Sequence, residues 1–111
     1  MHDDAVYLSH ILEAIEQIEA YIAGVDYSGF IKNKMMIDAV VRELEIIGEA
    51  TNNLSTDFRR RYPEIPFRDM VDMRNVLIHV YFGVNTEIVW RTCQKNLPSL
   101  KPQIKDALES Y

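Results

Sequence analysis

The chain has 111 residues, a formal net charge of −5, one cysteine, and a hydrophobic fraction of 48%. This length suits one domain, residues 1–111, and the composition excludes a disordered chain, an intrachain disulfide and a cysteine metal cluster. The acidic balance argues against binding nucleic acid mainly by bulk electrostatics, although a local basic site is compatible with it.

Apolar residues at alternating spacings of three and four predict two long helices in the first half of the chain. The first covers about 4–23 and ends at Gly24. A loop over 24–29, with Ser28 as the candidate cap, leads to a second helix from about Phe30 to Leu54. The first apolar seam is Leu8, Ile11, Ile15, Ile18 and Ile22, and the second is Ile37, Val40, Leu44, Ile47, Thr51 and Leu54.

Shorter helical segments are predicted in the second half of the chain. Ser55 opens a cap cluster, Pro63 and Pro66 frame a rigid corner, and Asn85 or Thr86 can cap a helix. A break or restart is expected at 97–98, where a leucine precedes a proline. The segments are about 57–61, 66–81, 85–90 and 98–108. Since no stretch alternates with strand period, the pattern predicts an all-α, up-and-down helical bundle of about five helices.

The surroundings of this bundle can also be inferred from the pattern. No apolar run reaches the ~20 residues of a transmembrane helix, and the opening residues, Met-His-Asp-Asp, differ from a signal peptide. We therefore expect a cytoplasmic protein. Its apolar surplus favours self-association as a homodimer.

The second long helix carries a polar stripe beside its apolar seam. Arg42, Glu45 and Glu49 lie along this stripe, and the two carboxylates share one face, where they repel each other mildly without a cationic partner. Neighbouring Val41 and Ala50 leave little fully exposed surface. The stripe is therefore either a solvated helix face or the lining of a cleft or interface.

The segment DMRNVLIHVYFGVN, residues 72–85, places Arg74, Asn75, His79 and Tyr81 close together. Histidine is the usual general acid–base near neutral pH, and arginine binds phosphate oxygens with a two-pronged fork. Because RNA carries its own nucleophile, the 2′-hydroxyl, such a pair suffices to cleave it without a metal ion. A histidine near a helix end is also often structural, so the spacing alone leaves both interpretations open.

Helix geometry bears on how these residues meet. Asn75 and His79 are four apart and share a helix face, whereas Arg74 and His79 are five apart and diverge by about 140°. A two-fold dimer that brings both helices into one cleft would resolve this divergence.

The motif Arg-x-x-x-x-His-x-Tyr at 74–81 resembles the signature of HEPN-domain toxins of the HepT-like family. Further blocks resemble that family in order and spacing, so the resemblance covers nearly the whole chain. Phe67 stands where family members commonly carry tryptophan. The matching blocks are RELEIIGEA at 42–50, LS at 54–55, YPEIP at 62–66, YFGV at 81–84, Trp90, and LP at 97–98.

The resemblance implies a HEPN-like homodimer that is the toxin of a type VII-like toxin–antitoxin pair. It implies a metal-independent endoribonuclease with no cofactor, acting on RNA such as tRNA or mRNA, with no DNA and no membrane as partners. Arg74 would stabilise the phosphorane-like charge, His79 would move the proton, and Asn75 would orient one of them, at a cleft shared by two protomers.

The resemblance also implies an antitoxin, a minimal nucleotidyltransferase (MNT type) that uses ATP to adenylylate Tyr81. The added phosphate would fill the cleft and pair with Arg74. The alternative function is a non-catalytic HEPN module that binds a nucleotide or the nucleotidyltransferase partner.

Other polar and aromatic residues have weaker signals. The run Arg59–Arg61 together with Arg68 either tracks RNA phosphates, grips an acidic partner or is simply solvated. Cys93 and Trp90 are expected to pack in the core, as is Tyr7. His2 and His10 lack the carboxylate spacing of a metal site.

Overall fold

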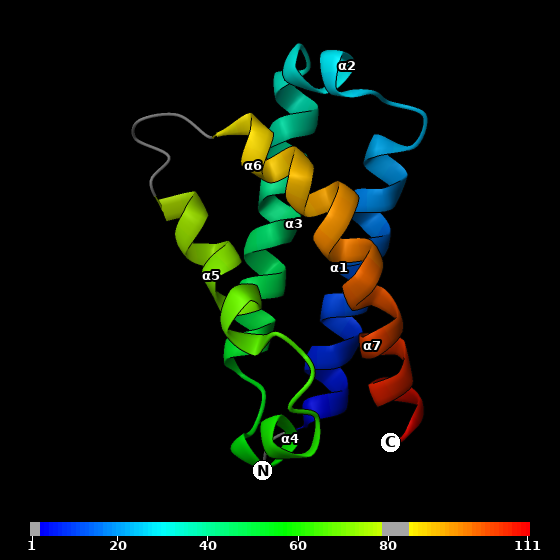
Figure 1. Ribbon diagram of the computed structural model, residues 1–111, viewed down its shortest axis with the longest axis vertical. Helices are drawn as coiled ribbons and strands as arrows, with labels where there is room; N and C mark the ends of the chain where they lie inside the picture. The colour runs from blue at the N-terminus through cyan, green and yellow to red at the C-terminus, as the bar shows by residue number, and fades with distance from the viewer. Residues whose placement is uncertain (1–2, 79–84) are drawn as a thin grey trace.

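Two antiparallel helices of equal length, α1 (Asp4–Ile22) and α3 (Lys34–Asn52), form the centre of the fold. The computed structural model describes residues 3–78 and 85–111, leaving out the side chains of 75–78. Figure 1 shows α3 between α1 on one side and α5 on the other, and α3 packs against both. Every regular element in the described residues is helical, so the predicted all-α bundle is confirmed.

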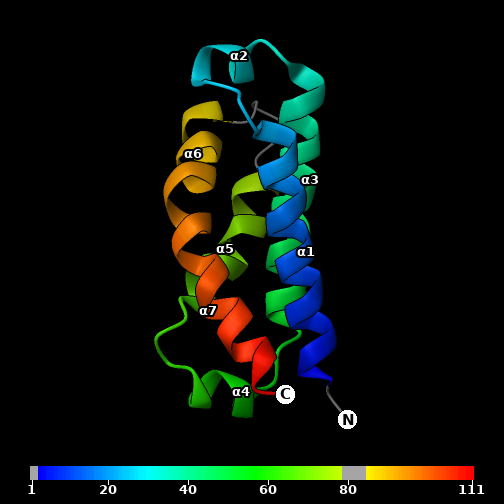
Figure 2. The ribbon, with the colours of Figure 1, turned by 90° about the vertical axis from the view of Figure 1, so that its right-hand side faces the viewer.

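The remaining helices are shorter and close the bundle around this pair. The last three segments follow one another directly as one bent rod, whose last part, α7, packs along α1 (Figure 2). Among the described residues, none of the helices combines the length and hydrophobicity that a membrane span requires. The bounds are α2 Tyr27–Ile31, α4 Thr56–Arg61, α5 Phe67–Ile78, α6 Thr86–Arg91, a π-helical turn η2 Thr92–Asn96, and α7 Leu97–Glu109.

The apolar seams of the two long helices form the core, as their spacing predicts. Every residue of the second seam is buried, and so are the first four residues of the first seam, while Ile22 is partly buried. Burying a large aliphatic side chain contributes about 1.5–3 kcal/mol. Thr51, the one polar member, satisfies its hydroxyl by donating to the carbonyl oxygen of Ile47 at 2.7 Å.

The start of the second long helix differs from the prediction, because a cap at Asn33 interrupts the segment that was expected to be continuous from Phe30. Asn33 accepts a hydrogen bond from the amide of Met36 and starts α3, so the helix begins at Lys34 rather than at Phe30. The short α2 precedes it, capped by Asp26, whose carboxylate accepts from the amide of Gly29. Ser28, the predicted cap, lies inside α2.

The C-terminal helices follow the prediction more closely. Asn85 caps α6 by accepting from the amide of Ile88 at 3.2 Å. The expected break near Pro98 is a widened π turn, after which the chain continues as α7 with this proline in its first turn. A proline ring clashes with the carbonyl four residues earlier in a regular α-helix, which accounts for a wider turn at this point. The helix predicted over 66–81 was expected to end at Tyr81, which falls outside the described residues.

The two ends of the described chain are joined at the α4 end of the bundle. Asp4 accepts hydrogen bonds from the backbone amide of Ser55 at 2.8 Å, from its hydroxyl at 2.7 Å, and from the Tyr111 hydroxyl at 3.4 Å. Ser55 in turn caps α4 by accepting from the amide of Phe58. One carboxylate therefore links the start of α1, the start of α4 and the end of the chain.

Cys93 is a buried free thiol in the π turn, 5% exposed, as predicted from its surroundings in the sequence. Burial raises the pKa of this thiol from 9.0 to about 12, because the thiolate would lose its hydration. The thiol is thus protonated and unreactive at neutral pH.

This raised pKa predicts a loss of stability at alkaline pH. Above pH 9 the unfolded thiol ionises while the folded one stays protonated, so the free energy of unfolding falls as pH rises from about 9 to about 12. Between about pH 8 and pH 10, urea unfolding of the wild-type chain should lose about 1.4 kcal/mol more than unfolding of Cys93→Ala. Equal losses in both proteins would contradict the assignment to this thiol.

Candidate functional site

Gly48 sets the distance between α3 and α5. A Cβ atom at this position would lie 2.8 Å from the Cβ of Arg74 and 2.9 Å from its backbone nitrogen. Real Cβ atoms do not approach backbone atoms this closely, so only glycine permits the observed packing. The backbone of α5 therefore rests on α3 at this point, and the contact fixes where the Arg74 side chain begins.

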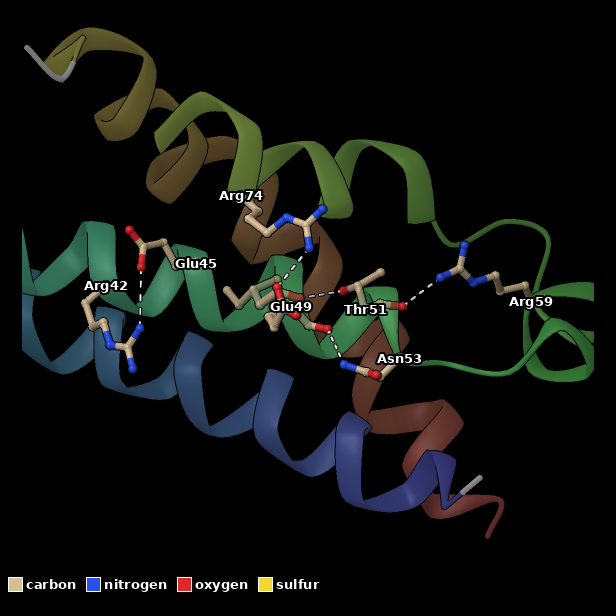
Figure 3. A network of polar contacts seen from close by, with 8 residues as sticks. Arg42, Glu45, Glu49, Thr51, Asn53, Arg59 and Arg74 are labelled. Carbon is tan, nitrogen blue, oxygen red and sulfur yellow. Dashed lines mark hydrogen bonds and ion pairs between the residues drawn. The ribbon is translucent and has the colours of Figure 1, made fainter. Parts of the chain in front are cut away.

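The next residue of α3, Glu49, determines where that side chain ends. The Nη1 atom of Arg74 donates to Glu49 Oε2 at 2.9 Å, across the gap between α5 and α3 (Figure 3). The Arg74 side chain is 35% exposed and that of Glu49 is 61% exposed. Ion pairs this open to water contribute about 0–1 kcal/mol to stability. The pair therefore orients the guanidinium more than it stabilises the fold.

A cleft of about 530 Å³ opens beside this ion pair. A second ion pair lies further along α3, where Arg42 Nη1 donates to Glu45 Oε2 at 3.4 Å. The cleft wall therefore carries two guanidinium groups and two carboxylates. Its lining is Tyr7 and His10 from α1; Arg42, Glu45, Ile46, Glu49, Ala50 and Asn53 from α3; and Arg74 from α5.

The structure brings four of the sequence-predicted site residues together at this cleft. Arg42, Glu45 and Glu49 lie on its α3 wall, although they are also substantially exposed, so the two interpretations of the polar stripe are not mutually exclusive. Arg74 faces them from α5.

The other predicted site residues cannot be compared in the same way. Asn75 belongs to α5, but its side chain is not among those described. His79 and Tyr81 lie outside the described residues. The predicted divergence of Arg74 and His79 therefore stays a prediction.

The cleft also contains residues that the sequence did not identify as part of a site. Tyr7 is partly buried against the core, as expected, but its ring edge also meets His10, with ring centroids 6.3 Å apart. Both side chains come from α1 and line the same cleft as Arg74. Their spacing of three places them on one helix face, which is the only sequence signal that they act together. Asn53 also lines the cleft, and its side-chain amide donates to the backbone carbonyl oxygen of Glu49 at 2.9 Å.

The arginine run of α4 has a different role from the cleft. Arg59 donates to the carbonyl of Thr51 at 2.8 Å and lies over the Phe67 ring, and Arg61 lies over the ring of Tyr62. These contacts attach α4 to its neighbours. Two of the arginines considered for RNA phosphates are thus engaged within the chain.

The chemistry available at the cleft is anion binding. Arg74 presents a planar group that can form two parallel hydrogen bonds to a phosphate, and Arg42 adds a second positive charge from α3. Among the described residues, no group of three or more histidine, cysteine, aspartate or glutamate side chains is arranged to hold a metal ion.

Comparisons with known proteins give the family context of this cleft. A family model described as "Ribonuclease HepT-like" matches residues 11–107. A Thermococcus cleftensis protein named "Probable ribonuclease HepT" is 48% identical over 95 residues, which are 86% of this chain and 86% of that protein. A "Putative RNase" of Caldanaerobacter subterraneus subsp. tengcongensis is 42% identical over 103 residues, 93% of this chain and 92% of that protein.

A longer relative also matches. A Methanocaldococcus jannaschii protein named "Gamma-glutamylcyclotransferase and putative RNase" is 43% identical over 107 residues. The match covers 96% of this chain but 48% of that protein, so the chain spans about half of its length. No solved structure matches the chain.

The contact at Gly48 predicts the effect of adding one methyl group. Alanine is favoured over glycine in a helix by about 1 kcal/mol, but the overpacking against α5 costs about 1–3 kcal/mol. We expect Gly48→Ala to lower the free energy of unfolding, measured with urea. Gly29→Ala is the matched control, because its Cβ would meet only side-chain atoms at 3.3 Å or more. A Gly48→Ala protein more stable than the wild type would contradict the close contact.

Proposed function

The chain belongs to the HepT-like ribonuclease family, and on this premise we propose that it is a metal-independent endoribonuclease whose site includes Arg74. One observation carries the proposal. The Arg74 guanidinium is held at the wall of an open cleft by a carboxylate that contributes little to stability. A phosphate can replace that carboxylate, because charge-assisted bidentate hydrogen bonds are stronger than an exposed ion pair.

The proposed reaction uses the nucleophile that RNA carries. The 2′-oxygen attacks the adjacent phosphorus, the bond from phosphorus to the 5′-oxygen breaks, and a 2′,3′-cyclic phosphate and a 5′-hydroxyl result. His79 accepts the proton from the 2′-hydroxyl and returns a proton to the leaving 5′-oxygen. Arg74 stabilises the additional negative charge on the phosphorane, and Asn75 orients one of these two groups.

We propose that the active form is a homodimer. On one helix Arg74 and His79 diverge by about 140°, so a single chain aims them at one phosphate poorly. A two-fold axis that brings two copies of α5 together supplies the Arg74 of one protomer beside the His79 of its partner. Arg42, Glu45 and Glu49 then line the entrance to the shared cleft.

The chain would act in the cytoplasm as the toxin of a toxin–antitoxin pair, with a minimal nucleotidyltransferase as the antitoxin. That partner transfers adenylyl groups from ATP to the Tyr81 hydroxyl. The resulting phosphodiester carries a negative charge seven residues along the chain from Arg74, the group that the RNA phosphate needs. Modification and substrate thus compete for the same cation, and inactivation requires no unfolding.

One observation favours the second candidate, a binding module without catalysis. The cleft carries as many carboxylates as guanidinium groups, and the whole chain is acidic, so long-range attraction of RNA is weak. In that case the cleft would bind a nucleotide or the nucleotidyltransferase, and a His79→Ala protein would retain all of its effects on growth.

The dimer proposal predicts complementation between inactive variants. Arg74→Ala and His79→Ala should each abolish RNA cleavage and growth arrest when expressed alone, with losses of about 10²-fold or more. Heterodimers of the two should regain about half of the wild-type cleavage rate, because one of the two symmetric sites then has both groups intact. Total-RNA cleavage provides the measurement, and a freely exchanging 1:1 mixture, in which about half of the dimers are heterodimers, should reach about a quarter of the wild-type rate.

Lys105→Ala is the matched control for charge loss, since this exposed lysine lies on α7 and does not line the cleft. If each variant is inactive and their mixture also stays inactive, the two groups act within one chain. Full activity of a folded His79→Ala protein would support the binding module instead.

The proposed modification predicts a change in mass. After co-expression with the nucleotidyltransferase, the intact mass of the wild-type chain should rise by whole adenylyl units and its RNA cleavage should fall. Tyr81→Phe should show no gain in mass and should stay active beside the partner. A mass gain that survives this substitution would place the acceptor on another residue.

A further inference from the structure

A second hollow, of about 360 Å³, lies away from the Arg74 cleft, where α2 meets α6. The two sites share no lining residue. In Figure 1, α2 and α6 stand at the end of the bundle opposite α4. The lining is Tyr27 from α2, Glu87, Trp90 and Arg91 from α6, and Gln94 and Lys95 from the π turn η2.

Two aromatic rings form the rigid side of this hollow. The Trp90 ring packs on fully buried Phe30, with ring centroids 5.0 Å apart, and on Tyr27 at 6.0 Å. The Tyr27 hydroxyl is hydrogen-bonded to the Thr86 hydroxyl at 3.2 Å. Trp90 and Tyr27 are only partly buried, so each keeps some ring surface towards solvent. Unstacked nucleobases stack on aromatic surfaces that are fixed in this way.

The other side of the hollow is polar and positively charged. Arg91 and Lys95 are exposed and four residues apart, and Glu87 is the one carboxylate in the lining. The ion pairs found within the described residues involve neither cation. The hollow therefore carries a formal charge of +1 in a chain whose total is −5. Gln94 adds an amide that can both donate to and accept from a base edge.

We propose that this hollow binds one unpaired nucleotide of single-stranded RNA, with its base against Trp90 and its phosphates beside Arg91 and Lys95. The proposal rests on the proposed function insofar as RNA is the substrate. It adds a contact outside the reacting site, which selects single-stranded segments because a base in a duplex cannot reach the ring. This contact would compensate for the weak long-range attraction that the acidic chain exerts on RNA.

Trp90 is the only tryptophan in the chain, so its fluorescence reports on this hollow directly. Titration of the cleavage-deficient Arg74→Ala protein with single-stranded oligoadenylate should quench the fluorescence in a saturable way. In an Arg74→Ala background, Arg91→Ala with Lys95→Ala should weaken binding about tenfold or more. The slope of log affinity against log salt should also fall by roughly 0.7 for each cation removed.

The matched control is Lys105→Glu, which lowers the net charge by the same two units at one exposed position on α7 and should leave the quenching unchanged. Two further ligands test the requirement for an unpaired base. The same sequence in a duplex and polyglutamate, a polyanion without bases, should both fail to quench the Trp90 fluorescence. Quenching that is equal in the Arg91→Ala, Lys95→Ala protein would overturn the proposal, as would equal quenching by the duplex or by polyglutamate.

Separate results test nucleotide binding at the α2–α6 hollow and RNA cleavage at the Arg74 cleft. If oligoadenylate quenches Trp90 as expected while the wild-type chain cleaves no RNA, the hollow stands and the catalytic proposal fails. If the wild-type chain cleaves RNA but Arg91→Ala with Lys95→Ala changes neither KM nor the quenching, the reverse holds.

Discussion

The absence of a side chain at Gly48 is the constraint on which the arrangement of the cleft depends. It lets the backbone of α5 rest on α3 beside Arg74, and the next residue along α3 is the carboxylate that meets the guanidinium. Glycine inside a helix costs about 1 kcal/mol relative to alanine. The large apolar seams of α1 and α3 offset this cost, so the position of a functional group is determined by packing in the core and not by the weak ion pair.

Charge is distributed in this chain so that local balance matters more than the total. The Arg74 cleft is close to neutral and the α2–α6 hollow carries a formal charge of +1, while the chain as a whole carries −5. A polyanion would therefore be repelled at a distance by the net charge, and its attraction to the chain would depend on local contacts with cationic side chains. Such an arrangement lowers the rate of association with RNA. It favours ligands that contact both a cationic side chain and the surface next to it.

Sequence reasoning anticipated the parts of the structure that follow from short-range rules. The seams of α1 and α3 follow from three–four spacing, and the caps at Ser55 and Asn85 follow from residue type. Choosing Asp26 over Ser28 as a cap depended on two similar local options, which propensity alone does not rank.

Features that depend on tertiary contacts were less accessible. The closeness of α5 to Gly48 and the shared cleft lining of Tyr7, His10 and Arg74 involve residues dozens of positions apart. Neither of these tertiary contacts produces a periodic pattern of residues in a single sequence. In contrast, the motif of Arg74 and the polar stripe of Arg42, Glu45 and Glu49 were visible as local patterns, and the fold brings them to one cleft. At the junction of α2 and α6 the sequence predicted only that Trp90 packs in the core, and its contact with Tyr27 was not foreseen.

The hydrogen bonds of Asp4 have a consequence for anything attached to this chain. Since this carboxylate contacts both Ser55 and Tyr111, the first helix begins and the last helix ends at the same end of the bundle, together with α4. A tag, linker or fused domain at either end would therefore emerge beside α4 and would have to travel the length of the bundle, whose longest extent is 42 Å, to obstruct the α2–α6 pole. Surface immobilisation through either end would leave that pole pointing into solution.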